Sequence, residues 1–170
     1  MDPRPFHILS YGTLLGTQIF QSFIGGIIAF RRLPRPQFAT LQTGIFPIYF
    51  GLQTALPVVI ALTVPSSQGG VTGVLHSDDR YSTLLPLVTA FVAGVINLLV
   101  MHPLVTKTMR DRKAQETRDG KKSYDPPPHS KEMLALNKKF GKLHGLSSLV
   151  NLISIAATAY YGVVLSKRLS

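Results

Sequence analysis

The chain has 170 residues, of which 45% are hydrophobic, and its formal net charge is +10. This length is typical of one domain, and the absence of cysteine excludes disulfide bonds, thiolate catalysis and thiolate metal sites. Because long uncharged apolar tracts alternate with one strongly basic segment, the pattern is typical of a membrane protein and not of a basic soluble protein.

Four apolar segments of at least 20 residues contain no charged side chain: Ile8–Phe30, Ile45–Val64, Tyr81–Met101 and Leu146–Leu165. A helix rises about 1.5 Å per residue, so about 20 residues cross the roughly 30 Å hydrocarbon core of a bilayer. Backbone polar groups in lipid must pair within their own segment, which favours helix. The sequence therefore predicts an all-α fold, in which residues 1–170 form a single integral membrane bundle of four transmembrane helices.

The connections between these spans differ in character. Between spans one and two, Pro36, Phe38 and Leu41 predict a short amphipathic helix on the cytosolic surface. Between spans two and three, Pro65–Arg80 is polar and rich in glycine, which predicts a loop on the opposite side.

The connection between spans three and four, residues 102–144, is a basic, proline-containing loop. Good helix formers over Thr106–Arg118 predict an extension of span three, and three prolines then predict an extended spacer. A second amphipathic helix is expected over Lys131–Lys142, with Ser130 as its N-cap. The cations that we expect near the membrane surface are Lys107, Arg110, Arg112, Lys113, Lys121, Lys122, Lys138, Lys139 and Lys142.

This basic loop has three interpretations. In the simplest interpretation its cations are solvated and only set the orientation of the spans in the membrane. In the second, the cations are attracted to anionic lipid headgroups, which would contribute about 1 kcal/mol per well-placed cation. Nucleic-acid binding is not expected, because Tyr124 and Phe140 are too few aromatic residues for a stacking surface.

The positions of lysine and arginine orient the spans. Eleven of the 18 Lys and Arg residues lie between spans three and four, and three more lie between spans one and two. The positive-inside rule then places both of these loops in the cytosol and both termini on the opposite side.

Polar side chains inside the spans form the candidate site, because such groups are costly in lipid unless they are paired. The candidate cluster is Gln18, Gln21, Gln53, Asn97, His144, Ser147, Ser148 and Asn151. One interpretation is hydrogen bonding between helices that pack closely through Gly12-xxx-Gly16 and Ala90-xxx-Gly94. The other is a polar pocket, open to the cytosol, for a small molecule, an ion or a lipid headgroup. The absence of Asp, Glu, Lys and Arg from the spans argues against a pump.

We find no pattern of residues that indicates catalysis. The sequence has no P-loop, no GxSxG elbow and no HExxH helix. His102 and His144 alone would make a poor metal site. No catalytic residue, metal or cofactor is therefore predicted.

Three blocks of sequence resemble the transmembrane protein 205-like family of small multi-span membrane proteins. The blocks are Gly16–Phe23 with Phe30–Phe50, Asn97–Pro103 with the charged helix that follows, and Leu143–Leu152. The resemblance implies a four-helix membrane domain that is not an enzyme. It also implies a location in intracellular membranes and a link to trafficking or drug response for animal members of the family. For fungal members it implies a location in mitochondria.

From these patterns we expect a membrane-embedded interaction or assembly factor without catalytic activity. Its partners would be the lipid bilayer and other membrane proteins or further copies of itself. The alternative is a transporter or binding protein for a small solute, an ion or a lipid that uses the polar cluster. We expect a mitochondrial membrane, with the endoplasmic reticulum or another endomembrane as the second choice.

Overall fold

The computed structural model describes residues 2–65, 74–75 and 80–169, with side chains up to Lys167. The described residues contain helices and no strand. In chain order the elements are α1 (Arg4–Ile19), η1 (Phe20–Gly25), α2 (Gly26–Arg32), α3 (Arg35–Leu62), α5 (Arg80–Ile96), η2 (Asn97–Met101), α6 (His102–Asp119) and α7 (Lys131–Leu169). Most of the predicted loop between Pro65 and Arg80 lies outside the described residues.

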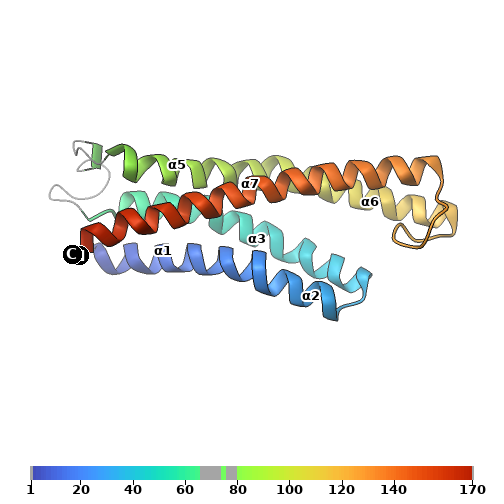
Figure 1. Cartoon of the computed structure of the whole chain (residues 1–170), viewed down its shortest axis with the longest axis horizontal. Coiled ribbons are helices and arrows are strands. Elements are labelled where there is room, and N and C mark those ends of the chain that lie inside the picture. Colours follow the sequence, from blue (N-terminus) through green and yellow to red (C-terminus); the bar gives the residue numbers. More distant parts are fainter. Residues whose placement is uncertain (1, 66–73, 76–79, 170) are drawn as a thin grey trace.

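These elements join into four long helical rods that lie along the long axis of the molecule (Figure 1). The first rod is α1–η1–α2, the second is α3, the third is α5–η2–α6 and the fourth is α7. Each rod is long and apolar enough to cross a membrane, and each contains one predicted span. The prediction of an all-α bundle with four membrane-spanning helices is therefore confirmed at the level of length and composition.

One predicted boundary was wrong. The short amphipathic helix expected after span one is the first part of α3, which continues without a break through Pro47 and Pro57. Continuation keeps the backbone hydrogen bonds that a break at the membrane surface would leave unpaired. The second amphipathic helix, by contrast, runs from Lys131 straight into span four as expected.

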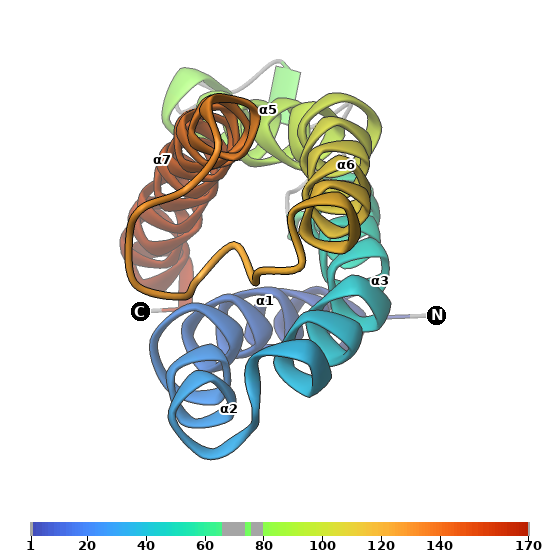
Figure 2. The same cartoon turned by 90° about the vertical axis from the view of Figure 1, so that its right-hand side faces the viewer.

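The four rods form a ring (Figure 2). Helix α1 packs on α3 and α7, and α5 packs on the same two helices. Both termini lie at one end of the bundle, and α6 with the first part of α7 forms a helical hairpin at the other end (Figure 1). This hairpin reaches past the turn between α2 and α3 (Figure 1).

The inside and outside of the bundle have the polarity expected in lipid. Leu9, Ile48, Leu85 and Leu99 face outward and are each about two-thirds exposed. Inside, an apolar core near the termini is made by Leu14, Ile60, Leu87, Tyr161 and Leu165. In the remaining interior, buried amide and hydroxyl side chains, described below, lie among further apolar side chains such as Phe50, Ala93 and Ile155.

Only one of the two predicted small-residue contacts is present. A Cβ at Gly94 would lie 2.8 Å from the carbonyl carbon and oxygen of Gln53, so α5 and α3 meet closely there. A Cβ at Gly12 or Gly16 would meet no heavy atom within 4 Å, and both glycines face outward. The predicted packing of Gly12-xxx-Gly16 was wrong for this chain, because α1 turns Leu14 and Gln18 inward from its other face.

Candidate functional site

The inward face of α7 carries a polar side chain at every turn across the bundle. Ser147, Asn151, Ser154, Thr158 and Tyr161 follow one another at intervals of four and three residues, which places them on one helix face. We call these five residues the polar seam. At about 1.5 Å per residue the polar seam extends over roughly 21 Å, most of the thickness of a bilayer core.

Asn151 is the centre of this seam. Its Oδ1 accepts hydrogen bonds from Tyr49 OH at 2.8 Å and from Gln53 Nε2 at 2.7 Å. Its Nδ2 donates to Ser22 Oγ at 2.9 Å, and Ser22 Oγ also lies 3.2 Å from Tyr49 OH. One side chain thus connects η1, α3 and α7.

One turn further along α7, Gln18 Nε2 donates to Ser154 Oγ at 3.0 Å. Gln18 and Gln53 are both fully buried, and the Oε1 atom of each has no hydrogen-bond partner among the residues that the structure describes. Two acceptor oxygens are therefore left unpaired beside Asn151 and Ser154, and such groups are costly in an apolar interior.

Two further amide contacts lie toward the hairpin end. Asn97 and Ser147 are joined twice, since Ser147 Oγ donates to Asn97 Oδ1 at 2.8 Å and Asn97 Nδ2 donates to Ser147 O at 3.3 Å. Gln21 Nε2 donates to Gln42 Oε1 at 2.9 Å. These bonds join η2 to α7 and η1 to α3.

At the opposite end, the polar seam finishes in a buried histidine. Tyr161 OH lies 2.8 Å from His7 Nε2, and His7 Nδ1 lies 3.2 Å from Thr63 Oγ1. The three residues come from α7, α1 and the end of α3, so they join three rods near the termini.

The π-helical turns coincide with the polar contacts. Gln21 and Ser22 lie in η1, and Asn97 begins η2. The wider turns are closed by bonds from Gly26 N–H to Gln21 O and from His102 N–H to Asn97 O. Because π-helical turns often occur at functional positions and change the direction of side chains, they single out these residues.

Six of the eight predicted cluster residues take part in these contacts, and two do not. His144 is exposed, and its ring is stacked on Phe140 with centroids 5.7 Å apart. Ser148 is also exposed and donates only to His144 O in its own helix. His144 continues the spacing of the seam, but its side chain is exposed and is not part of the buried contacts between rods.

The sequence alone did not single out several residues of these contacts: Tyr49, Gln42, His7, Thr63, Thr158 and Tyr161. An aromatic or hydroxyl residue in an apolar span has no distinctive local signal, since tyrosine and threonine also fit a core. The four- and three-residue spacing of polar residues on span four is the one signal that would have identified Thr158 and Tyr161.

The seam donates and accepts hydrogen bonds but contains no carboxylate or cation. Among the described residues no three His, Asp or Glu side chains come together to hold a metal ion. The arrangement can hold helices together, or hold a small molecule that hydrogen bonds.

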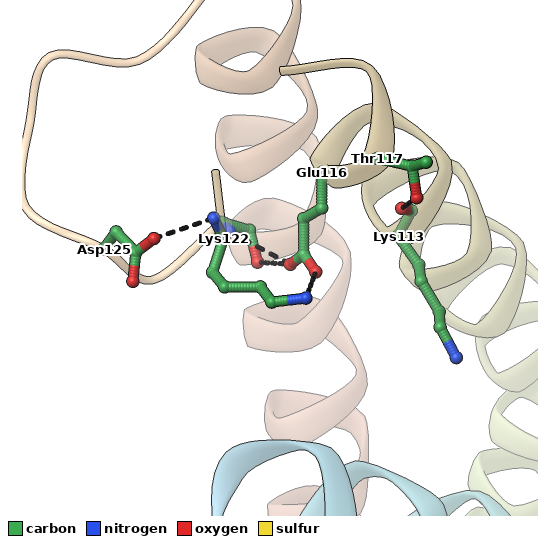
Figure 3. Close-up of polar contacts among 6 residues, drawn as sticks. Lys113, Glu116, Thr117, Lys122 and Asp125 are labelled. Carbon is green, nitrogen blue, oxygen red and sulfur yellow. Dashed lines mark hydrogen bonds and ion pairs between the residues drawn. The ribbon is translucent and has the colours of Figure 1, made fainter. Parts of the chain in front are cut away.

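The predicted basic loop is an ordered hairpin. Glu116 accepts hydrogen bonds from Ser123 N–H and Oγ, and lies 3.8 Å from Lys122 Nζ (Figure 3). Asp125 Oδ2 accepts a 2.8 Å bond from Lys122 N–H in the same turn (Figure 3). Lys121 Nζ donates to Pro128 O at 2.7 Å. The carboxylates of the turn are therefore used to fix its backbone.

A second set of contacts joins α6 to α7. Arg112 Nε donates to Asn137 Oδ1 at 2.8 Å, and its guanidinium carbon lies 4.5 Å from the centre of the Phe140 ring. Asn137 Nδ2 donates in turn to Ser123 O at 3.1 Å. Partial burial lowers the pKa of Arg112, and the Glu116 carboxylate acts in the opposite direction. Arg112 is thus a structural residue of the hairpin.

The start of α7 is capped as predicted. Ser130 Oγ accepts a 3.1 Å hydrogen bond from Met133 N–H and donates to Asp119 Oδ2 at 2.7 Å. The cap therefore also ties α7 to the end of α6. Of the other predicted cations of this region, six are exposed: Lys107, Arg110, Lys113, Lys138, Lys139 and Lys142.

A family model described as a domain of unknown function (DUF4149) matches residues 9–114. The chain belongs to this DUF4149 family. The match covers the first three rods of the bundle, up to the middle of α6.

One similar protein also matches the hairpin and α7 of this DUF4149 chain. It is the Xanthocillin biosynthesis cluster protein D of Aspergillus fumigatus, 32% identical over 165 residues, which cover 97% of this chain and 90% of the relative. No solved structure matches the chain. The resemblance to the transmembrane protein 205-like family is not tested by these comparisons and stays a prediction.

Proposed function

We propose that this protein is a non-catalytic membrane protein that holds partner proteins at a membrane. The four-rod bundle is the anchor, and the hairpin of α6 and α7 is the element that partners reach. The observation that carries the proposal is the braced hairpin, which projects beyond the α2–α3 turn (Figure 1). A flexible basic loop would determine the orientation of the spans equally well, whereas a loop of fixed shape favours the binding of a partner protein.

The interior supports an anchoring role. Asn151 joins η1, α3 and α7 through three hydrogen bonds, and a fourth links Ser22 of η1 to Tyr49 of α3. Ser147 and Ser154 add bonds to η2 and α1. Such pairing across helices favours one fixed arrangement of the bundle. A scaffold benefits from this rigidity, because its docking element is then held in one orientation.

The name of the Aspergillus relative adds a setting for the proposal. That name assigns the relative to a xanthocillin biosynthesis cluster. The name states no role in assembly or at a membrane, so the proposed assembly role rests on the hairpin and the bundle of this chain. We propose a mitochondrial membrane, with the endoplasmic reticulum as the alternative, and place the hairpin in the cytosol on the basis of the positive-inside rule.

The native mass of the tagged full-length protein, extracted from its home membrane in mild detergent, tests this function. We expect migration in a complex much larger than a dimer, together with the same companion proteins in repeated preparations. A Ser148→Ala variant, which changes an exposed residue outside the hairpin, should migrate with the same mass as the unchanged protein. A particle of monomer or dimer size would contradict the proposal.

A second candidate function is the binding or transport of a small molecule along the polar seam. It is favoured by the two buried Oε1 atoms of Gln18 and Gln53, which have no hydrogen-bond partner within the described part of the chain. These acceptor oxygens would be satisfied by a hydrogen-bond donor on a small solute or a lipid headgroup, or by a bound cation. The small-particle outcome of the native-mass measurement would favour this second candidate.

A further inference from the structure

The first turns of α7 carry a row of lysines on the side opposite to their packed side. Lys131, Lys138 and Lys142 lie at intervals of seven and four residues, so they share one face, and Lys139 lies beside them. All four side chains are exposed, whereas Met133 on the opposite face is fully buried. We call these four residues the lysine stripe.

The lysine stripe has no carboxylate partner in its own hairpin. Residues 102–144 contain eleven cations and five carboxylates. Three of the carboxylates are used inside the turn, on Ser123, Ser130 and the Lys122 backbone. Among the described residues no ion pair reaches the lysine stripe. Its charge is therefore available to another molecule.

The direction of the hairpin argues against lipid headgroups as that molecule. The hairpin continues along the long axis of the bundle, away from the spans (Figure 1). From Lys142, next to the fourth span, to Lys131 the helix rises about 16 Å. That distance is about twice the screening length of roughly 8 Å at physiological salt, so a membrane surface near Lys142 attracts Lys131 weakly.

The aromatic residues of the hairpin argue against single-stranded nucleic acid. Bases would need exposed rings on which to stack. Phe140 is partly buried between Arg112 and His144, and the exposed His144 ring already has one face against Phe140. Tyr124 is then the exposed ring of the hairpin that is not stacked on another ring. Charge complementarity without stacking fits an acidic protein segment better.

We propose that the lysine stripe binds an acidic segment of a soluble partner protein. The occupant would present Asp or Glu side chains along about 16 Å, the rise of α7 from Lys131 to Lys142. This inference rests on the proposed function, because it names the class of partner that the hairpin holds at the membrane. The first step of recognition would be electrostatic and would weaken with added salt.

Binding of a fluorescent peptide of alternating Glu and Ala to the full-length chain in neutral phosphatidylcholine nanodiscs tests the proposal. The stripe variant combines Lys131→Glu, Lys138→Glu and Lys142→Glu. The matched control combines Lys107→Glu, Arg110→Glu and Lys113→Glu, which makes the same charge change at exposed positions of α6. We expect the stripe variant to lose at least about tenfold in affinity and the control less than about threefold.

Two additional probes complete the test. A Lys and Ala peptide of the same length should bind the stripe variant and not the wild type. Equal losses in the two variants would overturn the proposal, because they would show attraction to net charge alone. Stripe-dependent binding of phosphatidylserine vesicles or of single-stranded RNA, without binding of the acidic peptide, would also overturn it. Lys→Gln versions at the same three positions should give intermediate affinities, and they guard against misfolding of the charge-reversed chain.

The stripe variant also separates this inference from the proposed function. If the wild type migrates in a large complex and the stripe variant keeps the same companions, the docking site is wrong and the assembly role stands. If the wild type is a small particle, the assembly role itself is wrong.

Discussion

Asn151 is the residue whose replacement should affect the bundle most, because its amide accepts two hydrogen bonds and donates a third. Measured hydrogen bonds between helices in membranes contribute about 0.6 kcal/mol each, and at most about 1.7 kcal/mol. Loss of the amide also leaves Tyr49 OH and Gln53 Nε2 without their acceptor, and unsatisfied buried groups add to the loss. The effect should therefore exceed that of a single bond.

We expect Asn151→Leu to lower the free energy of unfolding in mild detergent by about 2 kcal/mol. Ser148→Leu is the matched control, since Ser148 is exposed and bonds only within α7. It should change stability by less than about 0.5 kcal/mol. Equal stability of the two variants would show that Asn151 does not hold the helices together, and would favour a ligand for the polar seam.

The residues of the polar seam show which parts of a membrane site a sequence can predict. Amides such as Gln53 and Asn151 are conspicuous in an apolar span, because their burial needs a partner. The pair of His7 and Tyr161 is 154 positions apart along the chain, and its contact arises only when the ring of rods closes. Spacing along one helix placed His144 with the cluster, but its side chain is exposed in the folded bundle.

At the scale of helices, composition predicted the four spans, whereas the contacts between the helices depend on which face each rod turns to its neighbours. The two π-helical turns had no local signal, because they occur where Ser22 and Asn97 bond to other rods. The two small-residue motifs were equivalent in sequence. Gly94 is a close contact because α5 turns this face to α3, whereas α1 turns Gly12 outward.

This difference gives a matched pair of variants. A Cβ at Gly94 would lie 2.8 Å from the backbone of Gln53 and 2.9 Å from Thr54 N, and backbone atoms cannot rotate away. We expect Gly94→Ala to cost about 1–3 kcal/mol of stability, because α3 and α5 must separate. Gly12→Ala should be neutral or slightly stabilising, since alanine favours helix and nothing lies within 4 Å. Unfolding in the same detergent measures both, and equal stabilities would contradict the close contact.

At the scale of the whole molecule, charge is divided between the two ends of the bundle. Residues 31–35, around the turn between α2 and α3, and residues 102–144 of the hairpin region together contain 14 of the 18 Lys and Arg residues. Both termini lie at the other end (Figure 1). This division makes orientation testable and bears on the docking proposal, because a soluble acidic partner in the cytosol can reach the lysine stripe only if the hairpin faces the cytosol.

The absence of native cysteine allows each end to be labelled separately. We expect a single cysteine at Tyr124→Cys, in the exposed hairpin turn, to react with a membrane-impermeant maleimide added to the cytosolic side of intact home membranes. A single cysteine at Asp2→Cys, also exposed, should react only after detergent opens the membrane. The reverse pattern would place the hairpin in the lumen or the intermembrane space. Cytosolic partners would then be excluded, and the lysine stripe would have to bind an acidic protein of that compartment.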